Sequence, residues 1–421
     1  MHAPNHASPE AAGMSKTALA RVEAHLKQRY IDAGRLPGSQ FVVYRRGKVV
    51  HNGLQGFADV ERKVPVKDDT IFRIYSMTKP ITSTAFMMLF EEGRLALDEP
   101  VHKYIPSWKN LGVFAAGIAP SFLTRPPSRP MLIVDLMRHT SGLTYGFQQR
   151  SNVDAAYREK KLAESGTLEG MIEELAKIPL EFSPGEAWNY SVSTDVLGYL
   201  IGKISGQPFE QFLKERIFDP LGMSDTDFYV PADKAHRLAA CYSADPPGKL
   251  TFNAAERKGT LSLQDDPANS PYLAKPSFIS GGGGLVSTAA DYLTFCRALI
   301  NGGELGGVRL LGPKTLKLMT SNHLPGGVDL PAMSRAMFSE ASYNGMGFGL
   351  GFAVNLDPAK MMLPGSAREY NWGGAASTAF WVDPAEDLIA IFMTQLLPSS
   401  AYPIRRELRT MVYAAITESN L

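Results

Sequence analysis

The segments with strand-forming patterns lie at the two ends of this 421-residue chain, and their separation limits the folds that it can adopt. Residues 40–59 contain two apolar runs on either side of Arg46 and Gly47, where glycine permits the turn of a β-hairpin. Residues 377–395 repeat this pattern, and the glycine-rich segment 347–356 is predicted to form a further strand. The simplest architecture pairs the strands of both ends in one antiparallel sheet.

Helical periodicity fills most of the chain between these strands. An amphipathic helix is predicted over 15–35 and a last helix over 402–418. The other predicted helices are 77–92, 131–138, 169–177, 193–205, 208–216, 289–301 and 313–320. We therefore predict an α+β fold, an α/β sandwich in which helices flank the antiparallel sheet. Residues 1–80 and 281–421 form its α/β domain, residues 81–280 form an inserted, mostly helical domain, and the cleft between them is the expected active site.

Composition and charge exclude several classes of protein. The 43 basic and 42 acidic residues leave a net charge of +1, so we expect no nucleic acid and no anionic membrane as a partner. Two cysteines exclude a disulfide framework. No apolar run has the length of a membrane span or signal peptide, so a cytoplasmic location is expected. The eight histidines are dispersed, and no metal or cofactor is predicted. The oligomeric state stays open.

The most informative segment is 72–80, which contains Ser76 and Lys79. Serine favours the start of a helix and Pro80 is tolerated in a first turn, so a helix is predicted from Ser76 to Gly93. Residues three apart share a helix face, which brings the Lys79 amine to the Ser76 hydroxyl. A serine becomes a nucleophile when an adjacent base takes its proton, and a lysine can be that base if burial lowers its pKa. Only Ser76 among the serines has lysine at this spacing.

Tyr190 lies in a loop that follows a Pro-Gly turn and precedes a predicted helix. A tyrosine at this place packs against its neighbours, or it relays protons between a nucleophile and a leaving group. The residues alone leave both interpretations open.

Gly373 and Gly374 follow Trp372 at the entrance to a predicted strand. One interpretation of the two glycines is a β-bulge. The other is a backbone edge that a substrate can approach closely and that offers an N–H group to an oxyanion.

These three signals, in this order, resemble the serine β-lactamase and penicillin-binding-protein superfamily. The resemblance is greatest to the family VIII carboxylesterases, relatives of class C β-lactamases, and to statin-type acyltransferases. It extends over nearly the whole chain in six blocks: SPEAAGMS (8–15), FRIYSMTKPITS (72–83), LMRHTSGLTYG (136–146), FSPGEAWNYSVSTDVLGYLI (182–201), PLGMSDTDF (220–228) and GGGGLVSTAADYLTFCRALINGG (281–303).

The resemblance implies a β-lactamase/transpeptidase-like fold and a role for each residue of the three motifs. Ser76 would be the nucleophile, Lys79 its base and Tyr190 their partner in proton transfer. The backbone N–H groups of Ser76 and Ala375 would form the oxyanion hole. His139 belongs to a block that we interpret as structural. The substrate-binding edge would consist of Trp372, Gly373 and Gly374.

Two residues depart from the β-lactamase pattern. Val192 stands where β-lactamases carry an asparagine that holds the amide of the lactam side chain, and Trp372 replaces a lysine that pairs with the lactam carboxylate. A hydrogen bond to a charged group contributes roughly 1.5–3 kcal/mol, so both changes favour neutral esters over anionic lactams.

We therefore expect a serine carboxylesterase (EC 3.1.1 type) that hydrolyses small, short-chain acyl esters through an acyl-enzyme on Ser76. The chain contains no G-x-S-x-G motif, so an α/β-hydrolase is not supported. The alternatives are an acyltransferase of the same family, a β-lactamase or D-amino-acid peptidase, and a catalytically idle scaffold. Acyl chain length and alcohol group stay open.

Overall fold

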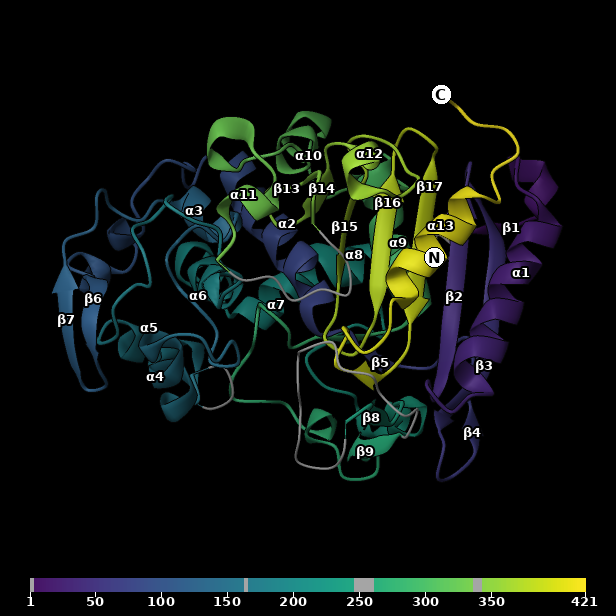
Figure 1. Cartoon of the computed structure of the whole chain (residues 1–421), viewed down its shortest axis with the longest axis horizontal. Helices are drawn as coiled ribbons and strands as arrows, with labels where there is room; N and C mark the ends of the chain where they lie inside the picture. Colours follow the sequence, from purple (N-terminus) through teal and green to yellow (C-terminus); the bar gives the residue numbers. More distant parts are fainter. Residues whose placement is uncertain (1–3, 163–165, 246–260, 336–342) are drawn as a thin grey trace.

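The largest sheet of the described residues has nine strands. Most of it lies in the right half of Figure 1. This computed structural model describes residues 4–162, 166–245, 261–335 and 343–421. The strand order is β1-β3-β2-β17-β16-β15-β14-β13, and β4 pairs with β3 outside this path. The strands are β1 (Asn5–His6), β2 (Gly38–Arg45), β3 (Lys48–Asp59), β4 (Val64–Pro65), β13 (Met346–Phe348), β14 (Ala353–Asn355), β15 (Tyr370–Gly373), β16 (Ala379–Asp383) and β17 (Leu388–Met393).

Two hairpins join the ends of the chain in this sheet. β2 and β3 pair antiparallel across Arg46 and Gly47, which both have positive φ, as a tight hairpin turn requires. β16 and β17 form the second hairpin, and β17 pairs with β2 from Leu388–Arg45 to Met393–Gln40. The predicted sheet of N- and C-terminal strands is therefore confirmed, with one short parallel pair, β1 with β3, at its edge.

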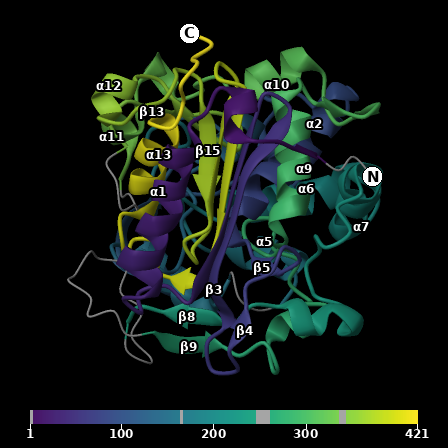
Figure 2. The ribbon, with the colours of Figure 1, turned by 90° about the vertical axis from the view of Figure 1, so that its right-hand side faces the viewer.

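Helices cover both faces of the sheet (Figure 2). On one face lie α1 and α13, whose buried side chains Leu19, Val22 and Leu408 share a core with the sheet residue Phe41. On the other face lies α9, which contacts β16 and β17 and belongs with α2 to the largest core. The helices are α1 (Lys16–Leu26), α2 (Thr78–Glu91), α3 (Ile133–Met137), α4 (Asn152–Lys160), α5 (Leu168–Leu175), α6 (Ser193–Ser205), α7 (Phe209–Leu213), α8 (Asp219–Leu221), α9 (Ala289–Ile300), α10 (Pro313–Met319), α11 (Leu330–Met333), α12 (Pro358–Met361) and α13 (Ile404–Tyr413).

The single strand predicted over 347–356 is wrong, because the segment folds into the hairpin β13–β14. Its glycines permit the turn: Gly351 has a φ of 98° and passes so close to Ser83 that a Cβ atom would lie 2.3 Å from the hydroxyl oxygen. Glycine-rich sequence therefore marked a bend here, and not a continuous strand.

The segment 81–280 contains helices α3 to α8 and also strands that the sequence did not predict. β6 and β7 form a hairpin beside α4, at the left edge of Figure 1. β8 pairs with both β9 and the C-terminal β18. The remaining strands of the described residues are β5 (Phe72–Arg73), β6 (Val113–Ile118), β7 (Ser121–Arg125), β8 (Cys241–Ser243), β9 (Ser262–Asp265), β10 (Val286–Ser287), β11 (Glu304–Leu305), β12 (Val308–Arg309) and β18 (Leu396–Leu397). Within the described ranges, no helix is both long and apolar enough to cross a bilayer.

Candidate active site

Ser76 lies in the 3-10 turn Tyr75–Met77, between β5 and α2. The sequence predicts that Ser76 begins the helix as its cap, but the helix begins at Thr78 and the cap position belongs to Met77. The Ser76 hydroxyl is therefore not used to cap the helix. Tyr75 has a φ of 43°, which is uncommon for a residue with a side chain and turns the backbone sharply before the serine.

Lys79 lies in the first turn of α2 and is only 1% exposed. Its Nζ atom is 3.3 Å from Oγ of Ser76, as the three-residue spacing predicts, and it donates to the carbonyl oxygen of Gly282 at 2.6 Å. Burial lowers the pKa of the amine to about 7, against an opposing effect of the Asp195 charge. Near neutral pH a large fraction of Lys79 is therefore uncharged and able to accept a proton.

The Tyr190 ring packs over the Lys79 amine, whose Nζ atom is 4.5 Å from the ring centre. Its hydroxyl accepts a hydrogen bond from Nε1 of Trp372 at 3.4 Å. Burial raises the pKa of Tyr190, and hydrogen bonds with Ser76 and Trp372 only partly oppose this effect. At neutral pH Tyr190 is therefore a phenol, suited to donate a proton, whereas Lys79 is suited to accept one.

The edge of β15 runs beside the turn that carries Ser76. Its pairing with β16 continues without a register shift through Trp372 and Gly373, so the β-bulge interpretation is wrong. A Cβ atom on Gly374 would lie 2.4 Å from the carbonyl oxygen of Ile74, and one on Gly373 would lie 2.6 Å from the Arg405 guanidinium. The two glycines are thus required by the protein's own packing, which brings this edge up to the serine.

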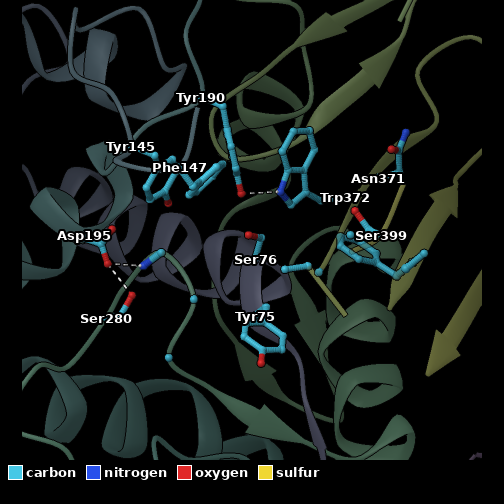
Figure 3. A pocket seen from close by; sticks show the side chains of 18 of the residues that line it. Tyr75, Ser76, Tyr145, Phe147, Tyr190, Asp195, Ser280, Asn371, Trp372 and Ser399 are labelled. Atoms are coloured by element: carbon cyan, nitrogen blue, oxygen red, sulfur yellow. Dashed lines mark hydrogen bonds between the residues drawn. The ribbon is translucent and has the colours of Figure 1, made fainter. Parts of the chain in front are cut away.

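A cavity of about 670 Å³ opens in front of these residues (Figure 3). Ser76, Tyr190, Trp372 and Ala375 border it, and so do Gly373 and Gly374. Much of the remaining wall is aromatic and consists of Tyr75, Tyr145, Phe147, Trp188, Phe228, Tyr272, Phe278, Tyr343, Phe380 and Trp381. The described residues contain no cluster of three or more His, Cys, Asp or Glu side chains that could hold a metal ion.

Two residues that the sequence singled out lie behind the cavity wall. Val192 is fully buried before α6 and does not border the cavity, so this position offers the cavity no side chain. His139 is buried against Tyr190, with ring centres 5.1 Å apart, and its Nδ1 atom lies 3.2 Å from Oγ of Ser191. Burial and the nearby Lys79 charge hold the pKa of His139 well below its usual value. A neutral histidine that supports the tyrosine ring fits the structural interpretation of this block.

Three groups to which the sequence assigned no role surround the Lys79 amine on its far side. Gly282 accepts its hydrogen bond, Tyr145 faces it with Nζ 5.4 Å from the ring centre, and Asp195 lies close enough to influence its pKa. The run of four glycines at 281–284 was the available signal, because such a run marks a close backbone approach.

Comparisons with known proteins agree with this geometry. The family model described as Beta-lactamase matches residues 19–414. The chain belongs to the β-lactamase family. It is 37% identical to Protein Rv1367c of Mycobacterium tuberculosis over 371 residues, 87% of this chain and 88% of that protein. It is 30% identical to Esterase EstB of Burkholderia gladioli over 430 residues, 98% of each chain.

A solved structure extends the comparison to three dimensions. EstCE1, described as a hydrolase with promiscuous acyltransferase activity, matches with a TM-score of 0.77 and 28% identity, over 94% of this chain and 99% of that one. The predicted β-lactamase/transpeptidase-like fold is therefore confirmed, and the family places this chain among the hydrolases of the serine β-lactamase superfamily.

The buried amine of Lys79 makes the stability of the fold depend on pH. Between pH values of about 10 and 7, the unfolded state holds a proton on Lys79 that the folded state largely lacks. The free energy of unfolding therefore falls as pH falls through this window, by up to about 1.4 kcal/mol per unit. We expect Lys79→Met to remove this dependence. In urea denaturation, the free energy of unfolding of the variant minus that of wild type should therefore increase from pH 10 to pH 7.

The control is Lys109→Met, at an exposed lysine. Its stability relative to wild type should not change over the same pH range. A pH-independent difference for Lys79→Met as well would show that Lys79 keeps an ordinary pKa.

Proposed function

We propose that the protein is a serine carboxylesterase that hydrolyses small, short-chain acyl esters through an acyl-enzyme on Ser76. The observation that carries the proposal is the buried Lys79 amine, 3.3 Å from the Ser76 hydroxyl and with a pKa near 7. A serine alone is a weak nucleophile, and a neutral amine at this distance is the base that it needs. The similarity to Esterase EstB of Burkholderia gladioli supports an ester as substrate.

The reaction begins when Oγ of Ser76 attacks the ester carbonyl carbon while Lys79 accepts the hydroxyl proton. The oxyanion that forms takes hydrogen bonds from the backbone N–H groups of Ser76 and Ala375. The bond to the alcohol then breaks, and Tyr190 donates the proton that the leaving alkoxide requires. The Lys79 ammonium, whose charge lies over the Tyr190 ring, returns its proton to the phenolate.

Deacylation repeats these steps with water as the nucleophile. Lys79 is neutral again once it has given up its proton, and it activates a water molecule that attacks the acyl carbon of Ser76. The tetrahedral intermediate uses the same two N–H groups, and its collapse returns a proton to Oγ of Ser76. No metal or cofactor takes part in any step of this proposal.

The cavity walls support a neutral, partly apolar substrate. Trp372 presents its ring to the cavity where the β-lactamase pattern has a lysine, and its N–H group is bound to Tyr190. A cavity of about 670 Å³ exceeds the space that a short acyl group needs, and the aromatic wall leaves room for the alcohol part of the ester.

A second candidate activity, hydrolysis of β-lactams, is favoured by one observation. Arg405 and Arg406 of α13 border the cavity, and an arginine pairs well with a carboxylate. Arg405 already donates to the carbonyl oxygens of Gly374 and Thr378, at 2.6 and 2.8 Å. Because these hydrogen bonds already use the Arg405 guanidinium, we rank esters above lactams as substrates. Acyl transfer to an alcohol uses the same acyl-enzyme, and the description of EstCE1 keeps it as a variant of the proposal.

We expect Ser76→Ala to lower the hydrolysis of 4-nitrophenyl butyrate by about a millionfold while the protein remains folded, because it removes the nucleophile. Intact-mass spectrometry of the wild type during turnover should show one butyryl group per chain, located on Ser76. Retention of a tenth of the wild-type rate by Ser76→Ala would disprove the assignment. A wild type that forms no adduct with butyrate or phosphonate esters would favour the idle scaffold.

We expect kcat/KM to be much higher for 4-nitrophenyl butyrate than for nitrocefin, because Trp372 leaves the lactam carboxylate without a lysine partner. Trp372→Lys should shift the ratio toward nitrocefin. Trp372→Phe is the matched control: it also removes the hydrogen bond to Tyr190, but it adds no charge and should not improve nitrocefin hydrolysis. Equal or higher efficiency of the wild type on nitrocefin would favour the β-lactamase instead.

A further inference from the structure

Asp195 is a buried carboxylate beside the cavity, 1% exposed and in the first turn of α6. Its Oδ1 atom accepts a hydrogen bond from the Ser280 hydroxyl at 2.5 Å and another from the Gly282 N–H group at 2.9 Å (Figure 3). Burial raises its pKa, and the Lys79 charge and these hydrogen bonds oppose the rise. Burial of a carboxylate destabilises the fold. The favourable interaction with the dipole of α6 does not explain this burial, because a carboxylate at an exposed helix start would gain the same interaction.

The segment that Asp195 holds is fitted tightly against α6. A Cβ atom on Gly282 would lie 2.6 Å from Oδ2 of Asp195, and one on Gly281 would lie 2.7 Å from the carbonyl oxygen of Thr194. The Thr82 hydroxyl also donates to the Gly281 carbonyl oxygen, at 2.8 Å. Side chains are excluded here, so the backbone itself approaches the carboxylate and the base of the site.

Gly282 joins the carboxylate to Lys79. Its N–H group donates to Asp195, and its carbonyl oxygen accepts from Nζ of Lys79 at 2.6 Å. The same Nζ atom lies 3.3 Å from Oγ of Ser76. A continuous chain of hydrogen bonds therefore runs from the carboxylate, through one glycine residue, to the amine and the serine.

We propose that Asp195 is a positioning residue for this reaction: its carboxylate fixes Gly282, and the Gly282 carbonyl holds the Lys79 amine beside Ser76. The inference rests on the proposed function, because it assigns to Lys79 the role of base. It gives a reason for the buried carboxylate and for the glycine run, which the motifs of the sequence left without a role.

The charge of Asp195 has a second effect, on the pH at which Lys79 becomes neutral. Six groups from five segments face the Lys79 amine. Ser76 lies in the turn just before α2, and the Gly282 carbonyl lies opposite. The others are His139 and Tyr145 from the segment after α3, Tyr190 from the loop before α6, and Asp195 from α6. The lowered pKa of His139 keeps its ring neutral, and the raised pKa values of Tyr145 and Tyr190 keep both phenols neutral. Asp195 is thus the charged group whose field raises the pKa of Lys79, against the larger effect of burial.

The test is Asp195→Asn, in which an amide oxygen still accepts both hydrogen bonds but the charge is gone. Without that charge the pKa of Lys79 falls further, so the acid limb of kcat/KM for 4-nitrophenyl butyrate should move down by about one pH unit. Ser280→Ala is the matched control, because it removes one hydrogen bond and keeps the carboxylate. Its acid limb should stay at the wild-type pH, whatever its kcat.

Each outcome bears on one claim. An unshifted acid limb in an active Asp195→Asn enzyme overturns the effect of the Asp195 charge on Lys79. The positioning role is tested by Asp195→Ala, which removes the acceptor of both hydrogen bonds and should lower kcat with little change in KM. An unchanged kcat in a folded Asp195→Ala enzyme overturns the positioning role, and either result leaves the proposed function intact. A wild type without ester hydrolysis overturns the proposed function itself. If Asp195→Asn does not fold, Asp195→Ser, which also removes the charge, must show the same downward shift, and an unshifted limb there overturns the charge effect equally.

Discussion

The burial of the Lys79 amine is the interaction on which the rest of the site depends. Every residue of α2 from Thr78 to Leu89 is buried, because the helix packs against α6 and lies inside the largest hydrophobic core. Burial is unfavourable for an ammonium group, and it lowers the pKa of Lys79 to about 7. The same burial that costs the fold stability supplies a neutral amine 3.3 Å from Ser76. Stability lost at an active site is a common consequence of such chemistry.

The sheet brings further groups to the pair formed by Ser76 and Lys79. Its order brings β15, from the end of the chain, to the turn that carries Ser76, from the beginning. Gly374 makes the approach possible, since any side chain there would collide with Ile74. Trp372, on the same strand, then reaches the hydroxyl of Tyr190 from the loop before α6. Three segments that are distant in the sequence therefore meet at one cavity.

The sequence predicted the parts of this arrangement that depend on local rules. The turn at Arg46 and Gly47 indicated its hairpin, and the three-residue spacing of Ser76 and Lys79 indicated their contact. The sequence did not predict that Asp195 lies beside Gly282, because the hydrogen bond between them spans 87 positions and no periodicity relates the two. The helix start was misplaced for a similar reason: serine is a good cap, but tertiary contacts around the turn took precedence over that preference. Strands as short as β8 and β18 carry too little pattern to be recognised alone.

The most direct test of this account is the titration of Lys79 itself. Protein labelled with 13C at the lysine ε-carbons would be followed by NMR from pH 5 to pH 11, with Lys79→Arg to assign the resonance. The account predicts one lysine that titrates near pH 7, well below the usual value of about 10.4, and whose signal disappears in the variant. If every lysine signal, that of Lys79 included, titrates near 10.4, Lys79 is charged at neutral pH and cannot be the base.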